Sequence, residues 1–369
     1  MNTTIVSRRG RGVASVLAFL ALVSCGGGGG GSSTPPTPES KVFFADGGNG
    51  AIVSFSTAAP TASFPIDRVI QGPATLLPTS GILAIPSLTL DAANNRLYVA
   101  TQGNTLVFNN ISMADGNVAP TFFMSATINT VGPGLRSVNF MHNDLNRSNG
   151  TLYSVDIFGE VHVFSNPVTA PSVVSRIITP DLGATTIAGT FGLALDAGKD
   201  MLYVGAVFNG TGSSNIIVFN NASAIGTAPL TGPGFPPPAT TVTPVAPTRT
   251  LSFAQPVVSF HLDTVNDHLY TAHSDGIVRV FHGASTLPTG TPIVDRTIDL
   301  GGSTPIDTYI FVDTSRNKLY AVASNTLTAS GALGIIDNAS TANEPTTTGN
   351  FFSFSNIANI ALSAIVVKP

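Results

Sequence analysis

The chain has 369 residues, of which only 10% are charged, and 16 basic against 20 acidic residues give it a formal net charge of −4. An average soluble domain has about 25% charged residues; here glycine, proline, threonine, serine and asparagine are abundant instead, which favours an all-β protein with many turns. No run of lysine or arginine could follow a phosphate backbone, so nucleic acid is not expected as a partner.

The first 24 residues have the pattern of an export signal. Arg8, Arg9 and Arg11 precede the apolar run VASVLAFLALV at 13–23. This run is too short to span a bilayer, so residues 1–24 are expected to be a signal peptide rather than a transmembrane helix.

The leader ends in LVSC, and its last residue, Cys25, is the only cysteine of the chain. The stretch from Leu22 to Cys25 resembles the lipobox of bacterial lipoproteins. The resemblance implies that Cys25 is acylated and holds the chain on a membrane. Because Gly26 rather than an aspartate follows, it also implies an outer membrane lipoprotein, on the periplasmic face or at the cell surface. The alternative is a buried thiol behind an ordinary cleavage site.

Residues 25–40 continue with GGGGGGSSTPPTPES from 26 onward. Six glycines resist regular structure because their backbone entropy cost is high, and the prolines that follow are stiff and extended. We expect 25–40 to be the lipidated cysteine and a tether that joins the membrane to a folded domain at 41–369.

Six related phrases fill that domain. Each contains an apolar strand, a polar turn, a second strand with an aromatic residue, a tight turn and two further strands. The aromatic residues, at intervals of 55, 55, 50, 67 and 50, are Phe43, Tyr98, Tyr153, Tyr203, Tyr270 and Tyr320. A period near 50 residues is typical of propeller blades. We therefore predict an all-β fold, a six-bladed β-propeller of four-stranded antiparallel blades.

The two ends of the domain predict how the ring closes. KVFFAD at 41–46 is a second strand without a first, and NIALSAIVVKP at 359–369 is a first strand without a second. Pairing the N-terminal and C-terminal strands completes one blade and removes two open sheet edges. The domain is expected to be a monomer.

The turns give further expectations. Four aspartates stand six residues before the leucine of the second strand: Asp91, Asp196, Asp263 and Asp313. They are expected to accept hydrogen bonds from backbone N–H groups of the turn; a metal ring is disfavoured because the four turns belong to separate blades. Glycine in Phe158-Gly159 and Asp275-Gly276 suits tight hairpins.

The fourth strands share an arginine: DRVI at 67–70, SRII at 175–178, TRTL at 248–251 and DRTI at 295–298. We expect these charges to lie on exposed outer edges, where they discourage edge-to-edge pairing. A ligand-binding ring of arginines is the alternative.

The phrase L-D-x5-L-Y-V with a following I-x-V-F, and the turns FNNIS at 108–112, FNNAS at 219–223 and DNAS at 337–340, resemble the NHL and YVTN-type bacterial propellers. The resemblance covers nearly all of 41–369 and implies the fold. Such propellers include lactonases, sugar dehydrogenases and binding modules, so it implies little about function. Gluconolactonase-like propellers hold a divalent metal at the channel mouth with Glu, Asn and Asp; here we expect Asp307 to be the only carboxylate near the start of an inner strand.

The candidate ligand-binding residues are Arg136, Asn139, His261 and Asp307, which the predicted topology brings toward the channel. His142 is a further inner-strand histidine, and for both histidines a packed role is the alternative. No catalytic motif is present, and neither a metal site nor a cofactor is expected.

Two functions remain open. The first is a non-catalytic binding or scaffold module for an envelope protein or a polysaccharide. The second is a metal-dependent, lactonase-like hydrolase with its site at the channel mouth. The scarcity of acidic residues favours the first. The proline-rich segment 229–248 cannot be a buried strand, and is either a recognition arm or a tolerated insertion.

Overall fold

The computed structural model describes residues 41–56, 66–79, 85–101, 103–124, 127–129, 135–165, 167, 174–228, 243–300, 307–325, 330–343, 350–353 and 362–368. The leader, Cys25, the tether and most of the proline-rich segment lie outside these residues.

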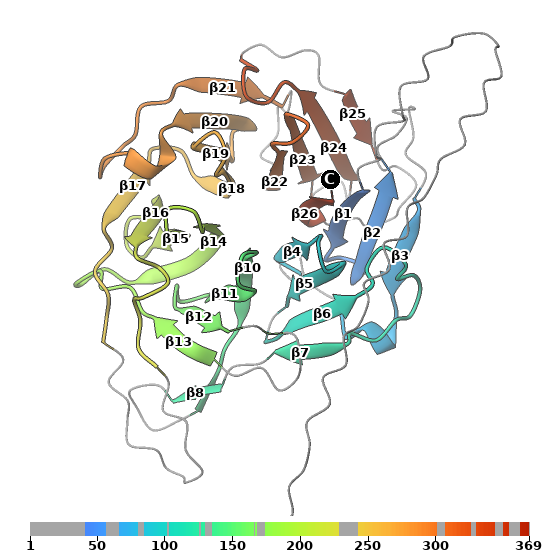
Figure 1. Ribbon diagram of the computed structural model, residues 1–369. Coiled ribbons are helices and arrows are strands. Elements are labelled where there is room, and N and C mark those ends of the chain that lie inside the picture. The colour runs from blue at the N-terminus through green and yellow to red at the C-terminus, as the bar shows by residue number, and fades with distance from the viewer. Residues whose placement is uncertain are drawn as a thin grey trace, which may run out of the picture. The chain divides into compact units, whose positions relative to one another are not determined.

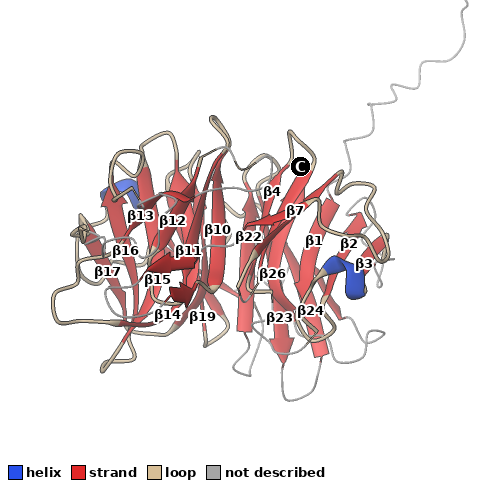
Figure 2. Ribbon diagram, turned by 90° about the horizontal axis from the view of Figure 1, so that it is seen from below, coloured by secondary structure: helices blue, strands red, loops and turns tan. Residues whose placement is uncertain are grey.

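Six four-stranded antiparallel sheets form the blades of a propeller, which confirms the predicted fold (Figure 1; Figure 2). Blade 1 contains β26 (Leu362–Lys368), β1 (Lys41–Asp46), β2 (Ala51–Ser56) and β3 (Arg68–Gln71). Blade 2 contains β4 (Ser87–Asp91), β5 (Arg96–Ala100), β6 (Thr105–Asn109) and β7 (Phe122–Met124). Blade 3 contains β10 (Phe140–Asn146), β11 (Thr151–Asp156), β12 (Val161–Phe164) and β13 (Val174–Ile178).

The remaining blades repeat the order. Blade 4 contains β14 (Ile187–Asp196), β15 (Met201–Phe208), β16 (Ser214–Asn220) and β17 (Arg249–Phe253). Blade 5 contains β18 (Val257–Asp263), β19 (His268–His273), β20 (Ile277–His282) and β21 (Arg296–Asp299). Blade 6 contains β22 (Asp307–Asp313), β23 (Lys318–Asn325), β24 (Ser330–Asp337) and β25 (Asn350–Ser353).

A two-stranded hairpin that the sequence did not indicate, β8 (Thr127–Asn129) and β9 (Leu135–Ser137), lies between blades 2 and 3 in the chain. The described helices are two short 3-10 turns, η1 (Pro73–Thr75) and η2 (Ala284–Thr286). Within the described residues, no helix is both long and apolar enough to cross a membrane.

The ring closes as predicted. β26, the last strand, pairs antiparallel with β1, the first, so that Phe43 lies opposite Val366 and Lys41 opposite Lys368. Every blade then has its first strand beside the central axis and its fourth strand outside (Figure 1).

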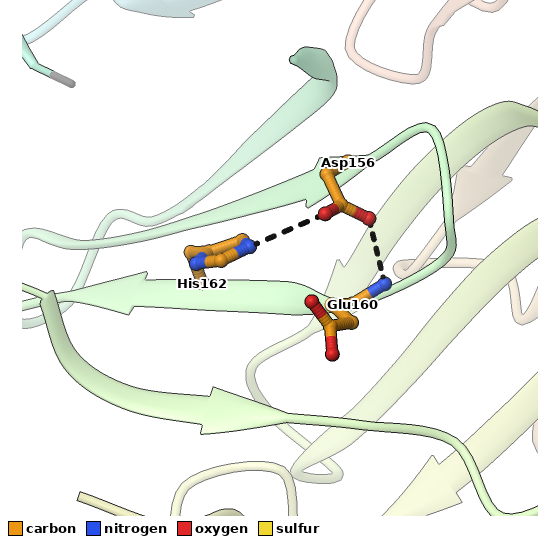
Figure 3. Close-up of side chains that lie close together, drawn as sticks. All are labelled: Asp156, Glu160 and His162. Atoms are coloured by element: carbon orange, nitrogen blue, oxygen red, sulfur yellow. Dashed lines mark hydrogen bonds and ion pairs between the residues drawn. The ribbon is translucent and has the colours of Figure 1, made fainter. Parts of the chain in front are cut away.

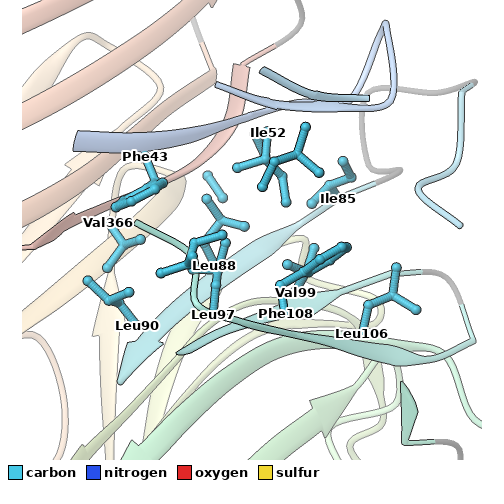
Figure 4. Close-up of a cluster of buried hydrophobic side chains, with 14 of the residues drawn as sticks. Phe43, Ile52, Ile85, Leu88, Leu90, Leu97, Val99, Leu106, Phe108 and Val366 are labelled. Carbon is cyan, nitrogen blue, oxygen red and sulfur yellow. The ribbon is translucent and has the colours of Figure 1, made fainter. Parts of the chain in front are cut away.

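The hydrophobic core is divided among the spaces between neighbouring blades. Successive residues of a strand point to opposite faces, and in a propeller blade both faces are covered. In β5, Leu97 and Val99 therefore pack toward blade 1 (Figure 4), while Tyr98 packs toward blade 3. This explains why the second strands are apolar without alternation, as in the phrase Leu-Tyr-Val.

The aspartates at the ends of the first strands accept backbone hydrogen bonds from the turns that follow, as predicted. Asp263, for example, accepts hydrogen bonds from the backbone N–H of Val265 at 3.1 Å and of Asn266 at 3.0 Å. In four blades the residue just before the second strand has a left-handed backbone. These residues, with φ of 52–56°, are Asn95, Asp200, Asp267 and Asn317. Asn and Asp adopt this conformation more readily than other residues that carry a Cβ.

These left-handed residues also bind the FNNAS-type turns. Ser223 of such a turn donates its N–H to Asp200 Oδ1 at 2.8 Å and its hydroxyl to Oδ2 at 2.7 Å. Ser285 makes the same two bonds with Asp267, at 2.9 and 2.7 Å. The repeated turn motif is therefore structural.

The arginines of the fourth strands correct the expectation of exposed edge charges. Each reaches across to the turn of the next blade and donates to a backbone carbonyl. The pairs are Arg68 to Met113 at 3.1 Å, Arg176 to Ala222 at 3.1 Å, Arg249 to Leu287 at 2.9 Å and Arg296 to Ala339 at 3.0 Å. A guanidinium can do this because its long stem spans the gap and its several N–H groups satisfy carbonyls that no strand pairs. These residues fasten blade to blade.

Candidate binding site in the central cavity

A cavity of about 580 Å³ lies on the propeller axis and is lined by the first strands of all six blades. This volume is within the range of small-molecule sites. Leucine is the most frequent residue of the wall, and serine, threonine, asparagine and histidine side chains stand among the apolar ones. The charged residues and histidines in the described lining are His142, Asp144, Arg147 and His261.

The register of the blades places six of the lining residues at equivalent positions. Each stands directly opposite the aromatic residue of the second strand: Thr89, Asp144, Ala194, His261, Phe311 and Val366. Around the ring, Ala194 of blade 4 therefore stands between Asp144 of blade 3 and His261 of blade 5. The repeated sequence pattern thus predicts which residue of each first strand lines the cavity at this depth.

Asp144 joins the innermost strands of blades 3 and 4. Its Oδ1 accepts the N–H of Leu145 at 2.7 Å, and its Oδ2 accepts the N–H of Leu195 in β14, also at 2.7 Å. Burial raises the pKa of this carboxyl, while Arg147 and the two backbone donors oppose the rise. Asp144 is the fifth residue of β10, so it is an inner-strand carboxylate at a different position from the one predicted for Asp307 at the start of β22.

The two histidines of the wall are neutral at pH 7. Burial lowers the pKa of His142 to about 4, against a hydrogen bond with the backbone of Thr190. Burial likewise lowers the pKa of His261 to about 4, with the charge of Arg147 acting in the same direction and that of Asp263 against it. The ring of His261 lies against that of Phe311, with centroids 4.7 Å apart. This wall therefore offers neutral imidazole nitrogens beside aromatic surface.

One mouth of the cavity is formed by the turns between first and second strands. Ser148, Thr264 and Thr314 contribute small side chains there, and Gly198 contributes only backbone. Arg147 is exposed at this mouth and donates through Nη2 to the carbonyl of Leu90 at 3.2 Å. The described lining of this mouth therefore consists of small uncharged residues and one charged side chain, Arg147.

Of the four predicted ligand residues, only His261 belongs to the described lining. Arg136 lies in β9 and Asp307 begins β22, but their side chains are outside the described part of the structure. Asn139 is exposed just before β10, and its carbonyl accepts the N–H of Ile157 at 3.2 Å. Of the two whose side chains are described, His261 lines the cavity and Asn139 does not.

Asp144 and Arg147 were missed, although the sequence carried a signal for Asp144. In blade 3 the turn position six residues before the leucine is Asn146, whose Oδ1 accepts the N–H of Ser148 at 3.1 Å. Aligning the phrases on this asparagine places Asp144 two residues earlier, at the position of His261. The acid of blade 3 is therefore not a turn residue.

No protein-family model matches the chain, and no curated protein matches it. Among solved structures, it is similar to the β-propeller domain of Cps50 (Swd1) from Myceliophteria thermophila, at 11% identity and a TM-score of 0.45, with 79% of this chain and 78% of that chain covered. It is also similar to the C-terminal WD40 domain of Sif2, at 14% identity and a TM-score of 0.41, with 83% and 68% covered. Similarity at this level carries no argument about function.

Proposed function

We propose that the chain is an outer membrane lipoprotein, anchored through Cys25, whose propeller is a binding module for an envelope protein or polysaccharide. The partner binds at the mouth formed by the turns after the first strands. The observation that carries this proposal is the central cavity itself: about 580 Å³, lined by all six blades, with apolar side chains interspersed with hydroxyl, amide and imidazole groups. A concave pocket of this size and mixed lining is typical of a small-molecule or ligand-binding site.

The chemistry of the wall supports binding over hydrolysis. The carboxylate of the described lining, Asp144, accepts two backbone N–H groups and is stabilised in its neutral form by burial. A metal-dependent hydrolase of the lactonase type uses several oxygen ligands at this place. Neutral histidines, phenylalanine rings and an arginine at the rim suit hydrogen bonding and stacking with a sugar or a peptide instead.

Anchoring is supported by the leader, the LVSC stretch and the glycine- and proline-rich tether. A single acyl chain binds membranes only marginally, whereas several chains anchor stably. Cys25→Ala should therefore move the protein from the membrane fraction to a soluble or unprocessed form. Unchanged membrane partitioning of the variant would contradict the lipid anchor.

Binding at the cavity mouth is tested with two neighbouring residues of one turn. Thr264 lines the cavity, whereas Val265 beside it is 78% exposed. We expect Thr264→Trp to obstruct the mouth and abolish capture of the partner from an envelope extract, while Val265→Trp captures it like the wild type. Equal capture by both variants would place the partner elsewhere.

A further inference from the structure

A second polar cluster lies outside the cavity, in the hairpin between β11 and β12 of blade 3. Asp156 ends β11, Glu160 precedes β12 and His162 is the second residue of β12. The imidazole points toward the Asp156 carboxylate, with His162 Nε2 3.6 Å from Asp156 Oδ2 (Figure 3). One ligand atom from each of the three residues lies within 4.8 Å of the others.

The histidine of this cluster is buried without hydrogen bonds. The side chains of His162 and Asp156 are both 0% exposed. Within the described part of the chain, neither Nδ1 nor Nε2 of His162 has a hydrogen-bond partner. The hydroxyl of Ser154, directly opposite on β11, is also buried and unpartnered among these residues. Burying a polar group without a partner costs about 1–3 kcal/mol, so the arrangement calls for something that binds the ring.

The surrounding chain holds the three residues in place. Asp156 Oδ1 accepts the N–H groups of Phe158 at 2.9 Å and Glu160 at 3.0 Å, while the other oxygen, Oδ2, faces the histidine. Gly159 has φ of 82°, and a Cβ there would meet Ile187 Cδ1 at 2.2 Å, so the tight turn requires glycine.

Two further contacts orient the ligands. Thr179 donates its hydroxyl to Glu160 Oε1 at 3.2 Å, and the ring of Phe140 meets that of His162 edge-on, with centroids 5.4 Å apart. Such outer contacts commonly orient metal ligands. The cluster is therefore pre-organised.

The donor set indicates which ion fits. Bonds of about 2.0–2.1 Å at tetrahedral angles put ligand atoms ~3.4 Å apart, close to the 3.6 Å between His162 and Asp156. Calcium and magnesium prefer oxygen ligands alone, whereas imidazole suits zinc and its neighbours. Two carboxylates balance the charge of a divalent ion.

We propose that Asp156, Glu160 and His162 bind a divalent transition-metal ion of the Zn²⁺ class. Glu160 is only half-buried, so its side is where the ion enters and where a water completes the coordination. The site lies in the second hairpin of blade 3 and is independent of the central cavity and of the proposed partner. It revises the expectation from sequence that the chain has no metal site.

The test is titration of the full chain, stripped of metal with a chelator, with Zn²⁺, Ca²⁺ or Mg²⁺ alone. We expect the wild type to bind one Zn²⁺ that His162→Leu does not bind, and to gain melting temperature with Zn²⁺ but not with Ca²⁺ or Mg²⁺. His273→Leu, which removes a buried histidine of blade 5, is the matched control and should keep both responses.

Glu160→Gln supplies a second measurement, because this half-buried residue can be changed without opening the core. It should weaken Zn²⁺ binding by about tenfold or more, even if His162→Leu fails to fold. Equal Zn²⁺ uptake by the wild type and Glu160→Gln, or a thermal response to Ca²⁺ but not to Zn²⁺, would overturn the proposal.

Discussion

The hairpin β11–β12 of blade 3 and the hairpin β19–β20 of blade 5 share one register. Tyr153 lies opposite Val163 as Tyr270 lies opposite Val280, and one step further along, Ser154 faces His162 where Thr271 faces Arg279. Both hairpins contain a buried histidine, but on different strands.

In blade 5 the histidine is fully partnered. His273 Nε2 lies 2.7 Å from the hydroxyl of Thr271, and its Nδ1 lies 3.1 Å from the carbonyl of Gln255. In blade 3 the position of His273 belongs to Asp156, and the imidazole of His162 stands across from Ser154 with neither nitrogen hydrogen-bonded in the described chain. A buried histidine is thus part of the core in one blade and a candidate ligand in the other. The two histidines are both buried and differ in their hydrogen bonds, so their burial alone does not distinguish them.

The largest expected effect concerns the closed ring that holds both hairpins. Deleting residues 360–369 removes β26, which pairs with β1 through six residues of that strand. We expect aggregation or loss of expression, because two hydrophobic strand edges become exposed. Deleting the tether 26–40 is the control and should leave a folded domain. A truncated protein that stayed monomeric with the parent's melting temperature would refute closure by these strands.

The next effect is the pH dependence of stability. Burial lowers the pKa of His142, His261 and His273 to about 4 each, and for His273 the charge of Arg279 adds to the effect. Between pH 6.5 and 4 the unfolded chain binds more protons than the native one, so the free energy of unfolding should fall as the pH is lowered through this window. The shift corresponds to ~3 kcal/mol for a fully buried histidine.

Asp144 opposes this trend, because its pKa is raised and acid relieves the cost of its buried charge. His273→Leu removes one of the three histidines whose lowered pKa causes the loss of stability in acid. Denaturant unfolding at several pH values should therefore show a weaker pH dependence for this variant than for the wild type. An unchanged slope would mean that His273 is not neutral in the native state.

A direct contrast of the two hairpins gives a smaller effect. In metal-free buffer, His273→Leu leaves the Thr271 hydroxyl and the Gln255 carbonyl without their partner and should cost about 1–3 kcal/mol of unfolding free energy. His162→Leu removes two nitrogens that make no hydrogen bond with the described residues and should change stability by less than about 0.5 kcal/mol, or raise it. Equal destabilisation by both substitutions would show that His162 is satisfied in the absence of metal.

The smallest effect is expected at the surface of blade 5. Arg279 pairs with Asp275 through Nη2 and Oδ2 at 2.6 Å, with side chains 19% and 32% exposed. Solvent screens such a pair, so Asp275→Asn should cost only about 0.5 kcal/mol in denaturant unfolding. A cost above 2 kcal/mol would mean that this pair, rather than the His273 hydrogen bonds, holds the hairpin.

The repeated phrase predicted the fold because each blade must bury both faces of its second strand and cap the same turn. The apolar Leu-Tyr runs, Asp263 and its equivalents, and the unpaired terminal strands therefore carried the architecture. The arginines of the fourth strands were misread, because the carbonyls they bind belong to the next blade and are distant in sequence. Arg176 and Ala222, for example, are 46 residues apart.

The sites were less predictable for a related reason. Asp144 could be placed by aligning Asn146 with the turn aspartates, but the hydrogen bond from Leu195 crosses between blades. His162 lies in a short apolar strand, VHVF, and only the surrounding contacts show that its ring makes no hydrogen bond with the described residues. The fold follows from local repetition, whereas Asp144 depends on a contact from the neighbouring blade and His162 on the hydrogen bonds that its own hairpin leaves unmade.

The central claim is that the partner binds at the cavity mouth. The most direct measurement is site-specific photo-crosslinking in the cells that produce the protein, with the reactive residue at Ser148, which lines the mouth, or at Ile293, which is 86% exposed before β21. The account predicts one discrete crosslinked product from position 148 and none from position 293. Crosslinking from position 293 alone, or equally from both, would contradict binding at the mouth.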